Sequence, residues 1–265
     1  MNKLIEIAIQ ASIKAGLEIL KIYHQNFDVA YKNDNSPLTQ ADKNANDSIM
    51  SFLEETNIPI ISEENKQVDF SERQKWRKCW IVDPLDGTKE FINKNGEFTV
   101  NIALIDNGTP QIGVIYVPVT KELYVGNVLE NKSYKVTITT NFDINNVCIK
   151  ENLIIPNTKN KDIKVVGSRS HMNQATETFL NKLKAENDSV EVVSKGSSLK
   201  FCLVAEGKAD IYPRFAPTME WDTAAGQAIC EAVNLQVIST ETNKSLRYNK
   251  ENLLNPYFIC HNGIK

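Results

Sequence analysis

Long apolar runs, clusters of basic residues and paired cysteines are all missing from this 265-residue sequence. Without an apolar run long enough to cross a bilayer, we expect no transmembrane segment. Near the N-terminus, Glu6, Gln10 and Lys14 interrupt the apolar residues, a pattern unlike that of a secretory signal peptide. We therefore expect a protein that is neither embedded in a membrane nor exported.

The few cysteines and histidines also lack the spacings that bind metals. The five cysteines include no C-x-x-C pair, and such a dispersed, odd set is typical of reduced, buried thiols in a cytoplasmic protein. His24, His171 and His261 are too far apart in sequence to indicate a histidine-based zinc site. A metal bound here would need mainly oxygen ligands, which favours Mg²⁺.

The charge pattern excludes another class of partner. The formal net charge is −3 at pH 7, and no run of Lys or Arg exceeds two residues. The basic surface typical of nucleic-acid-binding proteins is therefore not expected. The length and the 42% of apolar residues are enough for one large domain or two smaller ones, each with its own core.

Residues up to about 140 are expected to form an α+β sub-domain, 1–140. Apolar periodicity predicts helices over residues 4–22 and 41–55, and a loop at "NDNSPLTQAD" (33–42). Short strands are predicted over 58–61 and 79–82, and an antiparallel meander over 98–128. The polar, Asn-rich residues 130–160 are interpreted as a turn-prone seam between two sub-domains.

The second sub-domain, 141–265, has an alternating pattern. Predicted strands (163–168, 190–194, 209–213 and 235–239) alternate with predicted helices (172–184, 197–206 and 223–233). This alternation is typical of an α/β layer with crossover helices.

Acidic residues directly follow apolar stretches at three places in the chain. Glu63 and Glu64 follow "IPII", Asp83 and Asp86 follow "CWIV", and Asp222 lies in "MEWDTAAGQAI". Each alone could be a solvated residue, and Asp222 could cap the helix predicted over 223–233. A cluster of these carboxylates would be electrostatically unfavourable, because two carboxylates about 4 Å apart repel by about 4 kcal/mol at an effective dielectric near 20. A hard divalent cation would relieve that repulsion.

The turn "DPLDGT" (83–88) combines several features of a phosphate-processing site. Pro84 restricts the backbone so that the Leu85 carbonyl is available beside Asp83. Gly87 permits a tight turn, and Thr88 begins a short helix whose free N–H groups favour an anion. The combination indicates metal-assisted phosphoester hydrolysis, with two cations about 3.5–4 Å apart on the reacting oxygens.

Four other interpretations make different demands on the same residues. Haloacid-dehalogenase-type phosphatases place their nucleophile two residues before the second Asp, where this chain has Pro84. An EF-hand would need a ligand at Leu85. A metal- or nucleotide-binding regulator without turnover stays open, and Asp42 and Thr88, as candidate water-activating residues, distinguish it from an enzyme. An inert scaffold leaves the acids unexplained.

The run "DPLDGTKEFINKNGEFTVNIALIDNG" resembles bacterial 3′(2′),5′-bisphosphate nucleotidases of the CysQ type, in the inositol monophosphatase superfamily. The resemblance extends from "NSPLTQAD" through "ISEE" to "SRSH", "GSSLKFCLVAEGKADIYPRF" and "WDTAAGQAI". "DPxDGT" with a distal "WD" marks the superfamily. "GTKEFI" and "GSSLKFC" favour the nucleotidase branch over inositol monophosphatases, which tend to carry "GTTNF" and are the alternative.

The resemblance implies an αβαβα sandwich of the inositol monophosphatase type, with the site between two sub-domains. It implies hydrolysis of adenosine 3′,5′-bisphosphate to AMP and phosphate in sulfate assimilation, with phosphoadenosine phosphosulfate as a second substrate. It also implies two or three Mg²⁺ ions, inhibition by lithium, and a cytoplasmic location with peripheral membrane attachment in some relatives.

The resemblance further implies a role for individual residues. Metal ligands would be Glu63, Asp83, the Leu85 carbonyl, Asp86 and Asp222. Asp42 and Thr88 would activate the attacking water, and Glu64 would position a further water or metal. Substrate contacts would come from the metal ligands Glu63, Leu85, Asp86 and Asp222, and from Gly87, Thr88, Ser197, Lys200, Arg214 and His171.

Overall fold

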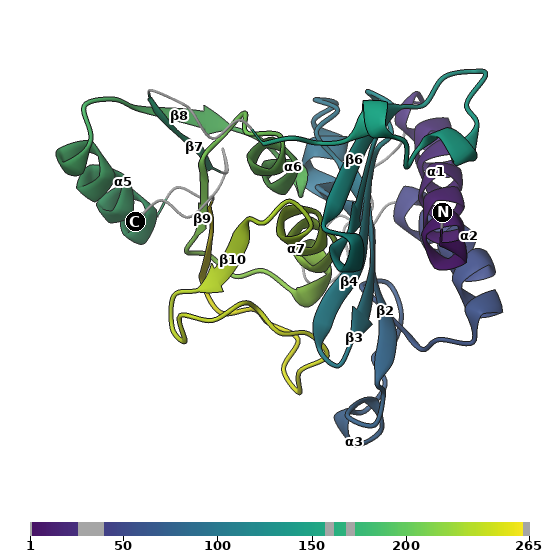
Figure 1. Ribbon diagram of the computed structural model, residues 1–265. Coiled ribbons are helices and arrows are strands. Elements are labelled where there is room, and N and C mark those ends of the chain that lie inside the picture. Colours follow the sequence, from purple (N-terminus) through teal and green to yellow (C-terminus); the bar gives the residue numbers. More distant parts are fainter. Residues whose placement is uncertain (1, 26–39, 157–161, 168–172, 262–265) are drawn as a thin grey trace.

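The computed structural model of the chain describes residues 2–25, 40–156, 162–167 and 173–261. Five layers follow one another across these residues: two helices, a six-stranded sheet, two helices, a five-stranded sheet and a single helix (Figure 1). This order confirms the predicted αβαβα fold class.

The first sheet contains six strands in chain order: β1 (Ile60–Ser62), β2 (Lys78–Asp86), β3 (Thr99–Asp106), β4 (Thr109–Val117), β5 (Glu122–Asn127) and β6 (Lys132–Thr137). β1 and β2 are parallel and the other pairs are antiparallel, which confirms the predicted meander. β6 corrects the interpretation of 130–160 as a seam without strands. It is an edge strand, and the Lys132 and Lys135 that protect such an edge also obscure its apolar alternation.

The turn between β3 and β4 follows directly from its sequence. Asn107 and Gly108 both have positive φ, 50° and 73°. An Asn-Gly pair adopts these values at low cost, and the resulting two-residue turn matches the twist of antiparallel strands. The turn therefore pairs Asp106 with Thr109, and a bulge shifts the register of the two strands beyond Ile105.

Two long helices cover the outer face of the first sheet (Figure 1). They are α1 (Lys3–Tyr23) and α2 (Gln40–Leu53), which confirm the helices predicted over 4–22 and 41–55. The Asn2 side chain caps α1 by accepting the Leu4 N–H at 2.9 Å. Of the predicted loop over 33–42, residues 33–39 lie outside the described residues.

Shorter helices connect these elements. They are α3 (Phe70–Arg73), α4 (Thr88–Ile92) and the 3₁₀ turns η1 (Glu54–Thr56), η2 (Val128–Glu130), η3 (Ile144–Asn146), η4 (Lys150–Asn152) and η5 (Glu220–Asp222).

The second sheet has the strand order β10-β11-β9-β7-β8. Its strands are β7 (Ile163–Gly167), β8 (Val190–Ser194), β9 (Ile211–Arg214), β10 (Gln236–Ser239) and β11 (Phe258–His261). β7 is parallel to β8 and β9, as the alternating pattern predicted. β11 was not predicted; it is antiparallel to both β9 and β10. The proposed sub-domain boundary at 140/141 stays a prediction.

The helices of the second half are α5 (Gln174–Glu186), α6 (Leu199–Ala205) and α7 (Ala224–Glu231). α6 and α7 lie between the two sheets, and α5 covers the far side of the second sheet (Figure 1). None of the helices in the described ranges has the length and apolar character needed to span a membrane.

α7 packs on the first sheet with almost no side chain between the backbones. A Cβ atom added at Gly113 in β4 would collide with the Ala225 carbonyl oxygen of α7. One added at Gly126 in β5 would lie 2.7 Å from the Ile229 Cα atom. These two glycines therefore fix the distance between the first sheet and the helix that begins just after Asp222.

Candidate active site

Asp83 and Asp86 lie at the C-terminal end of β2, where a bulge interrupts its pairing with β3. Asp83 is opposite Asn101 and Asp86 is opposite Thr99, so three steps along β2 match two steps along β3. Side chains alternate between the faces of a strand, and residues three apart normally point to opposite faces. The extra residue brings both carboxylates to one face. Pro84 lies within the bulge, where a missing N–H disrupts no ladder.

Glu63 joins these aspartates from the neighbouring parallel strand. Ser62 of β1 is opposite Val82, and the Glu63 N–H donates to the Val82 carbonyl oxygen at 3.2 Å. Parallel strands end at the same edge of a sheet, so Glu63 reaches the end of β2. The charges of Glu63 and Asp83 act on each other, which places the two carboxyl groups close together.

Asp42 and Glu64 add negative charge at the same edge. Asp42 is buried in the first turn of α2, and its charge acts on both Glu63 and Asp83. Glu64 is partly buried next to Glu63, and its charge acts on that neighbour. The acids predicted from the first half of the chain therefore lie together.

Asp222 brings a carboxylate from the second half of the chain. It ends η5, one residue before Thr223, which caps the start of α7, and its charge acts on Asp83. Its side chain accepts the Met219 N–H at 2.8 Å, whereas the N-cap position of α7 belongs to Thr223. The alternative role of Asp222 as the cap of this helix is therefore wrong.

Burial, together with the charges of neighbouring acids, raises the pKa values of Glu63, Asp83 and Asp222. Desolvation and then the charge of Asp42 raise the pKa of Glu63 to about 7, although this residue is exposed at the edge of the sheet. Burial and the charge of Asp86 raise the pKa of Asp222 to about 8. Burial and the charge of Glu63 raise the pKa of the buried Asp83 well above its usual range. Arg214 lowers the pKa of Asp222, but its charge does not offset burial and the neighbouring carboxylates.

The donor chemistry of the cluster fits a hard divalent cation. Its side-chain donors are all carboxylate oxygens, the ligands that Mg²⁺ prefers. In the described ranges, no three Asp, Glu, His or Cys side chains already converge on one ion position. Mutual repulsion keeps uncompensated carboxylates apart, so cation binding would have to draw the side chains together.

The remainder of the "DPLDGT" turn is formed as predicted. Gly87 has a φ of 95° and is the N-cap of α4, which begins at Thr88. The buried Leu85 donates its N–H to the Asp83 carboxylate at 3.1 Å. A Cβ atom at position 87 would lie 3.3 Å from the Ser197 Cβ atom, so the two halves of the chain meet closely here.

Ser197, Lys200 and Arg214 form a polar group on the second half of the chain. Within the described residues, the buried Oγ atom of Ser197 and Nε atom of Arg214 have no hydrogen-bond partner. The buried Lys200 donates to the carbonyls of Ser197 at 2.5 Å and Lys195 at 3.3 Å. Burial lowers the pKa of Lys200 to about 8, while the charge of Asp86 acts in the opposite direction.

Unsatisfied buried donors beside a cation are typical of an anion site that lacks its ligand. His171 lies outside the described residues, so its substrate contact stays a prediction.

Three residues around Asp86 were not predicted: Thr99, Asn101 and Ser198. Ser198 donates to the Asp86 carboxylate at 2.6 Å, and Asn101 donates to Ser198 at 2.8 Å. A signal for Asn101 exists, because it is a polar residue inside the otherwise apolar run "FTVNIALI". Ser198 carries no signal of its own beside Ser197.

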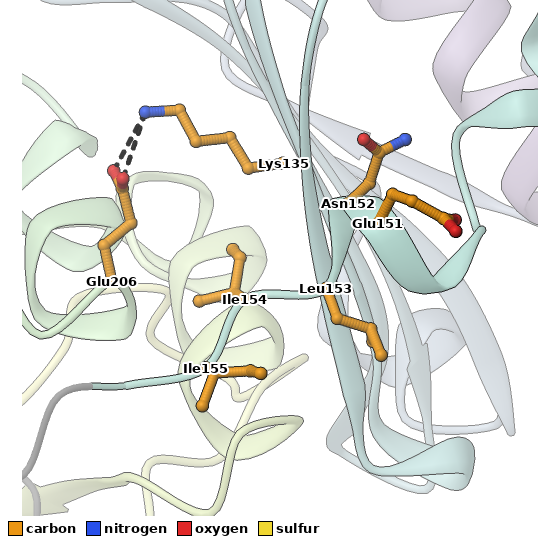
Figure 2. A pocket seen from close by; sticks show the side chains of 7 residues that line it. All are labelled: Lys135, Glu151, Asn152, Leu153, Ile154, Ile155 and Glu206. Atoms are coloured by element: carbon orange, nitrogen blue, oxygen red, sulfur yellow. Dashed lines mark hydrogen bonds and ion pairs between the residues drawn. The ribbon is translucent and has the colours of Figure 1, made fainter.

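A separate pocket of about 230 Å³ is lined by none of these residues. Its lining consists of Lys135, Glu151, Asn152, Leu153, Ile154, Ile155 and Glu206 (Figure 2). Lys135 and Glu206 face each other across it at 3.1 Å, and Glu206 also accepts the Tyr124 hydroxyl at 2.8 Å. Its main charged groups are thus paired with each other, so the acid cluster is the stronger candidate for the active site.

Comparisons with known proteins identify the family of the chain. A sequence model of the inositol monophosphatase family matches residues 1–262. The chain is 43% identical over 254 residues to the 3′(2′),5′-bisphosphate nucleotidase CysQ of Shigella flexneri, covering 94% of this chain and 96% of the relative. It is 42% identical to the protein of the same name from Escherichia coli K12, with the same coverage.

Solved structures give the same result. The crystal structure of CysQ from Bacteroides thetaiotaomicron, a bacterial member of the inositol monophosphatase family, matches with a TM-score of 0.89 and 47% identity. The match covers 99% of this chain and 98% of that one. Inositol monophosphatase II of Staphylococcus aureus, at 21% identity and a TM-score of 0.76 over 99% and 90% of the chains, shares the fold. The chain described here is a member of the inositol monophosphatase family.

Proposed function

We propose that this protein is a magnesium-dependent 3′(2′),5′-bisphosphate nucleotidase that hydrolyses adenosine 3′,5′-bisphosphate to AMP and phosphate. The names of relatives 42–43% identical over nearly the whole chain support this substrate. Within the structure, the proposal rests on one juxtaposition: the acid cluster lies beside the group formed by Ser197, Lys200 and Arg214.

A bisphosphate carries two anionic groups, which need two sites of different character. The acid cluster with its cations would take the phosphate that is removed. The second phosphate would give partners to the Ser197 hydroxyl and the Arg214 Nε atom, which have none among the described residues. An inositol monophosphate has one phosphate and would leave this second group unpaired. The arrangement thus favours a bisphosphate over the alternative substrate.

The side chains of the first site have distinct proposed roles. The metal ligands would be Glu63, Asp83, the Leu85 carbonyl, Asp86 and Asp222, holding two or three Mg²⁺ ions. When bound, Mg²⁺ neutralises phosphoryl oxygens and lowers the pKa of water. Asp42 would accept a proton through the Thr88 hydroxyl, which would orient the attacking water. Glu64 would position a further water.

The N–H groups of Gly87 and Thr88 at the start of α4 would contact the phosphate. His171 would contact the base.

The resemblance to the nucleotidases supports several further properties. Phosphoadenosine phosphosulfate would be a second substrate, lithium would inhibit the reaction, and sulfate assimilation would supply the by-product that is hydrolysed. The resemblance also supports a cytoplasmic location, with peripheral attachment to the inner membrane.

The proposal is tested by phosphate release from adenosine 3′,5′-bisphosphate, inositol 1-phosphate and fructose 1,6-bisphosphate, each with and without Mg²⁺ and Li⁺. We expect the adenosine compound to be hydrolysed with the highest kcat/KM, only in Mg²⁺, and Li⁺ to inhibit. A preference for inositol 1-phosphate would assign the alternative substrate. Saturable nucleotide binding without phosphate release would favour a regulator.

A further inference from the structure

We propose that Ser198 is a positioning residue that orients the metal ligand Asp86 and ties it to the half of the chain that carries Asp222. Ser198 directly precedes α6 and is 2% exposed. Its Oγ atom lies 2.6 Å from the Asp86 Oδ2 atom and 2.9 Å from the Asp222 carbonyl oxygen. The inference rests on the proposed metal site.

The hydroxyl group of Ser198 has one proton for two acceptors. The contact with Asp86 is shorter, and its acceptor is a carboxylate, so the proton belongs to this bond. The contact with the Asp222 carbonyl keeps the backbone of the second candidate ligand within reach of the same side chain. One hydroxyl thus touches two metal-site segments that are far apart in the sequence.

Asn101 completes the arrangement from β3. Its Nδ2 atom donates to Ser198 Oγ at 2.8 Å and to Asp86 Oδ2 at 3.3 Å. The Thr99 hydroxyl donates to Asn101 Oδ1 at 3.0 Å, which leaves the amide nitrogen directed at the carboxylate. Thr99 and Asn101 are both at most 1% exposed, so the arrangement is well shielded from water.

The two carboxylate oxygens of Asp86 are thereby distinguished. Oδ2 accepts bonds from Ser198 and Asn101, whereas no described residue donates to Oδ1. Fixing one oxygen with protein donors presents the other in a set direction. Such outer partners commonly orient metal ligands, and their loss typically costs 10- to 100-fold in metal affinity or activity.

The segment 195–198 is also held in place at its N-terminal end. Glu97 accepts the Gly196 N–H at 2.9 Å and the Lys195 ammonium at 3.1 Å. Ser197 lies between these contacts and those of Ser198, and its φ of 46° is uncommon for a residue other than glycine. Surrounding contacts must maintain such a backbone. Ser198 therefore also helps to hold Ser197, a member of the proposed second phosphate site.

The test uses the Mg²⁺ dependence of thermal stability in the absence of substrate. For Ser198→Ala, we expect the Mg²⁺ concentration that gives half-maximal stabilisation to rise about tenfold or more. Phosphate release at saturating Mg²⁺ should also fall. Ser198→Thr keeps a hydroxyl donor and should lie closer to the wild type than Ser198→Ala does.

Ser133→Ala is the matched control. Ser133 is fully buried, and its hydroxyl donates to the Ile229 carbonyl at 2.7 Å, so it too joins the first sheet to the second half. We expect this variant to lower the melting temperature of the metal-free protein without changing the Mg²⁺ midpoint. An equal shift of that midpoint in both variants would reduce Ser198 to a general structural role and overturn the inference.

Asn101→Ala provides a second route to the same result. If Asn101 and Ser198 act on one oxygen of Asp86, the double variant should raise the Mg²⁺ midpoint by less than the product of the single effects. A wild-type midpoint in both single variants would overturn the inference while leaving the nucleotidase activity intact. A wild-type protein that Mg²⁺ does not stabilise would instead contradict the metal site itself, and the inference with it.

Discussion

The Asn101 side chain donates to Asp86 at 3.3 Å, although Asn101 is the strand partner of Asp83 and not of Asp86. The bulge in β2 therefore brings Asp86 within reach of the strand partner of Asp83. Two like charges are brought together by backbone geometry and by a neutral amide donor. The resulting repulsion affects both the activity and the stability of the protein.

Replacing Asp83 with Asn should separate those two effects. With Mg²⁺, we expect phosphate release to fall more than about 100-fold, because loss of a ligand exceeds the cost of losing an outer partner. Without metal, we expect the free energy of unfolding near pH 8 to rise by about 1.4 kcal/mol or more, the equivalent of one pKa unit. Phosphate assays and denaturation with a chelator measure the two quantities. Asp106→Asn, at a surface ion pair with Arg77, is the control.

Unchanged phosphate release from Asp83→Asn would exclude Asp83 as a ligand, and reduced stability without metal would contradict the crowding of the acids. Asp222→Asn should likewise abolish turnover with the fold intact.

The stability of the metal-free protein should fall as pH rises, whereas a salt-bridged acid makes the free energy of unfolding rise with pH. Carboxyl pKa values near 4 in the unfolded chain compare with about 7 for Glu63 and about 8 for Asp222 in the folded chain. Between these values the folded chain binds more protons than the unfolded chain. The free energy of unfolding should therefore fall as pH rises from about 4 to about 8.

Urea denaturation with a chelator measures this dependence, and Asp83→Asn should flatten it. Mg²⁺ should restore stability at the upper end of the window, because it binds the folded chain preferentially. A stability that rises across the window in the metal-free protein would rule out the charge crowding.

Thr88→Ala tests the proposed water activation. A residue that moves a proton acts mainly in the transition state, so we expect kcat to fall about 100-fold or more and KM to change much less. Steady-state kinetics with adenosine 3′,5′-bisphosphate measures both constants. Thr120→Ala, at the exposed turn before β5, should leave both unchanged. A defect confined to KM would move Thr88 to substrate binding.

Arg214→Met tests the second phosphate site. Loss of a charged hydrogen-bond donor should cost about 1.4 kcal/mol or more, which corresponds to a tenfold higher KM for adenosine 3′,5′-bisphosphate. Hydrolysis of a nucleoside 3′-monophosphate should change little, because it lacks the second phosphate. Arg77→Met, on the surface, is the matched control. Equal losses on both substrates would place Arg214 outside a second phosphate site.

Much of the fold could be predicted because its signals are local. The periodicity of residues 4–22 indicated α1, and the Asn107-Gly108 turn separated β3 from β4. β6 was missed because the lysines of this edge strand obscure its apolar alternation, and β11 was missed because no helix separates it from β10, so it falls outside the alternating pattern. Tertiary pairing, which no local window contains, stabilises both.

The candidate site was predictable to the extent that it is contiguous. The "DPLDGT" turn placed Asp83, Asp86 and Thr88 together within six residues. Asp222 could be assigned to the site only from its apolar sequence surroundings and from the family resemblance. The bulge and the bonds from Ser198 and Asn101 were not predictable, since they arise from strand register and from contact between segments about 100 residues apart.

Gly113 and Gly126 place the backbone of α7 directly on β4 and β5. No side chain larger than hydrogen fits between these backbones, and Asp222 lies two residues before the first residue of the helix. We therefore expect Asp222 to keep its position relative to the first sheet throughout turnover.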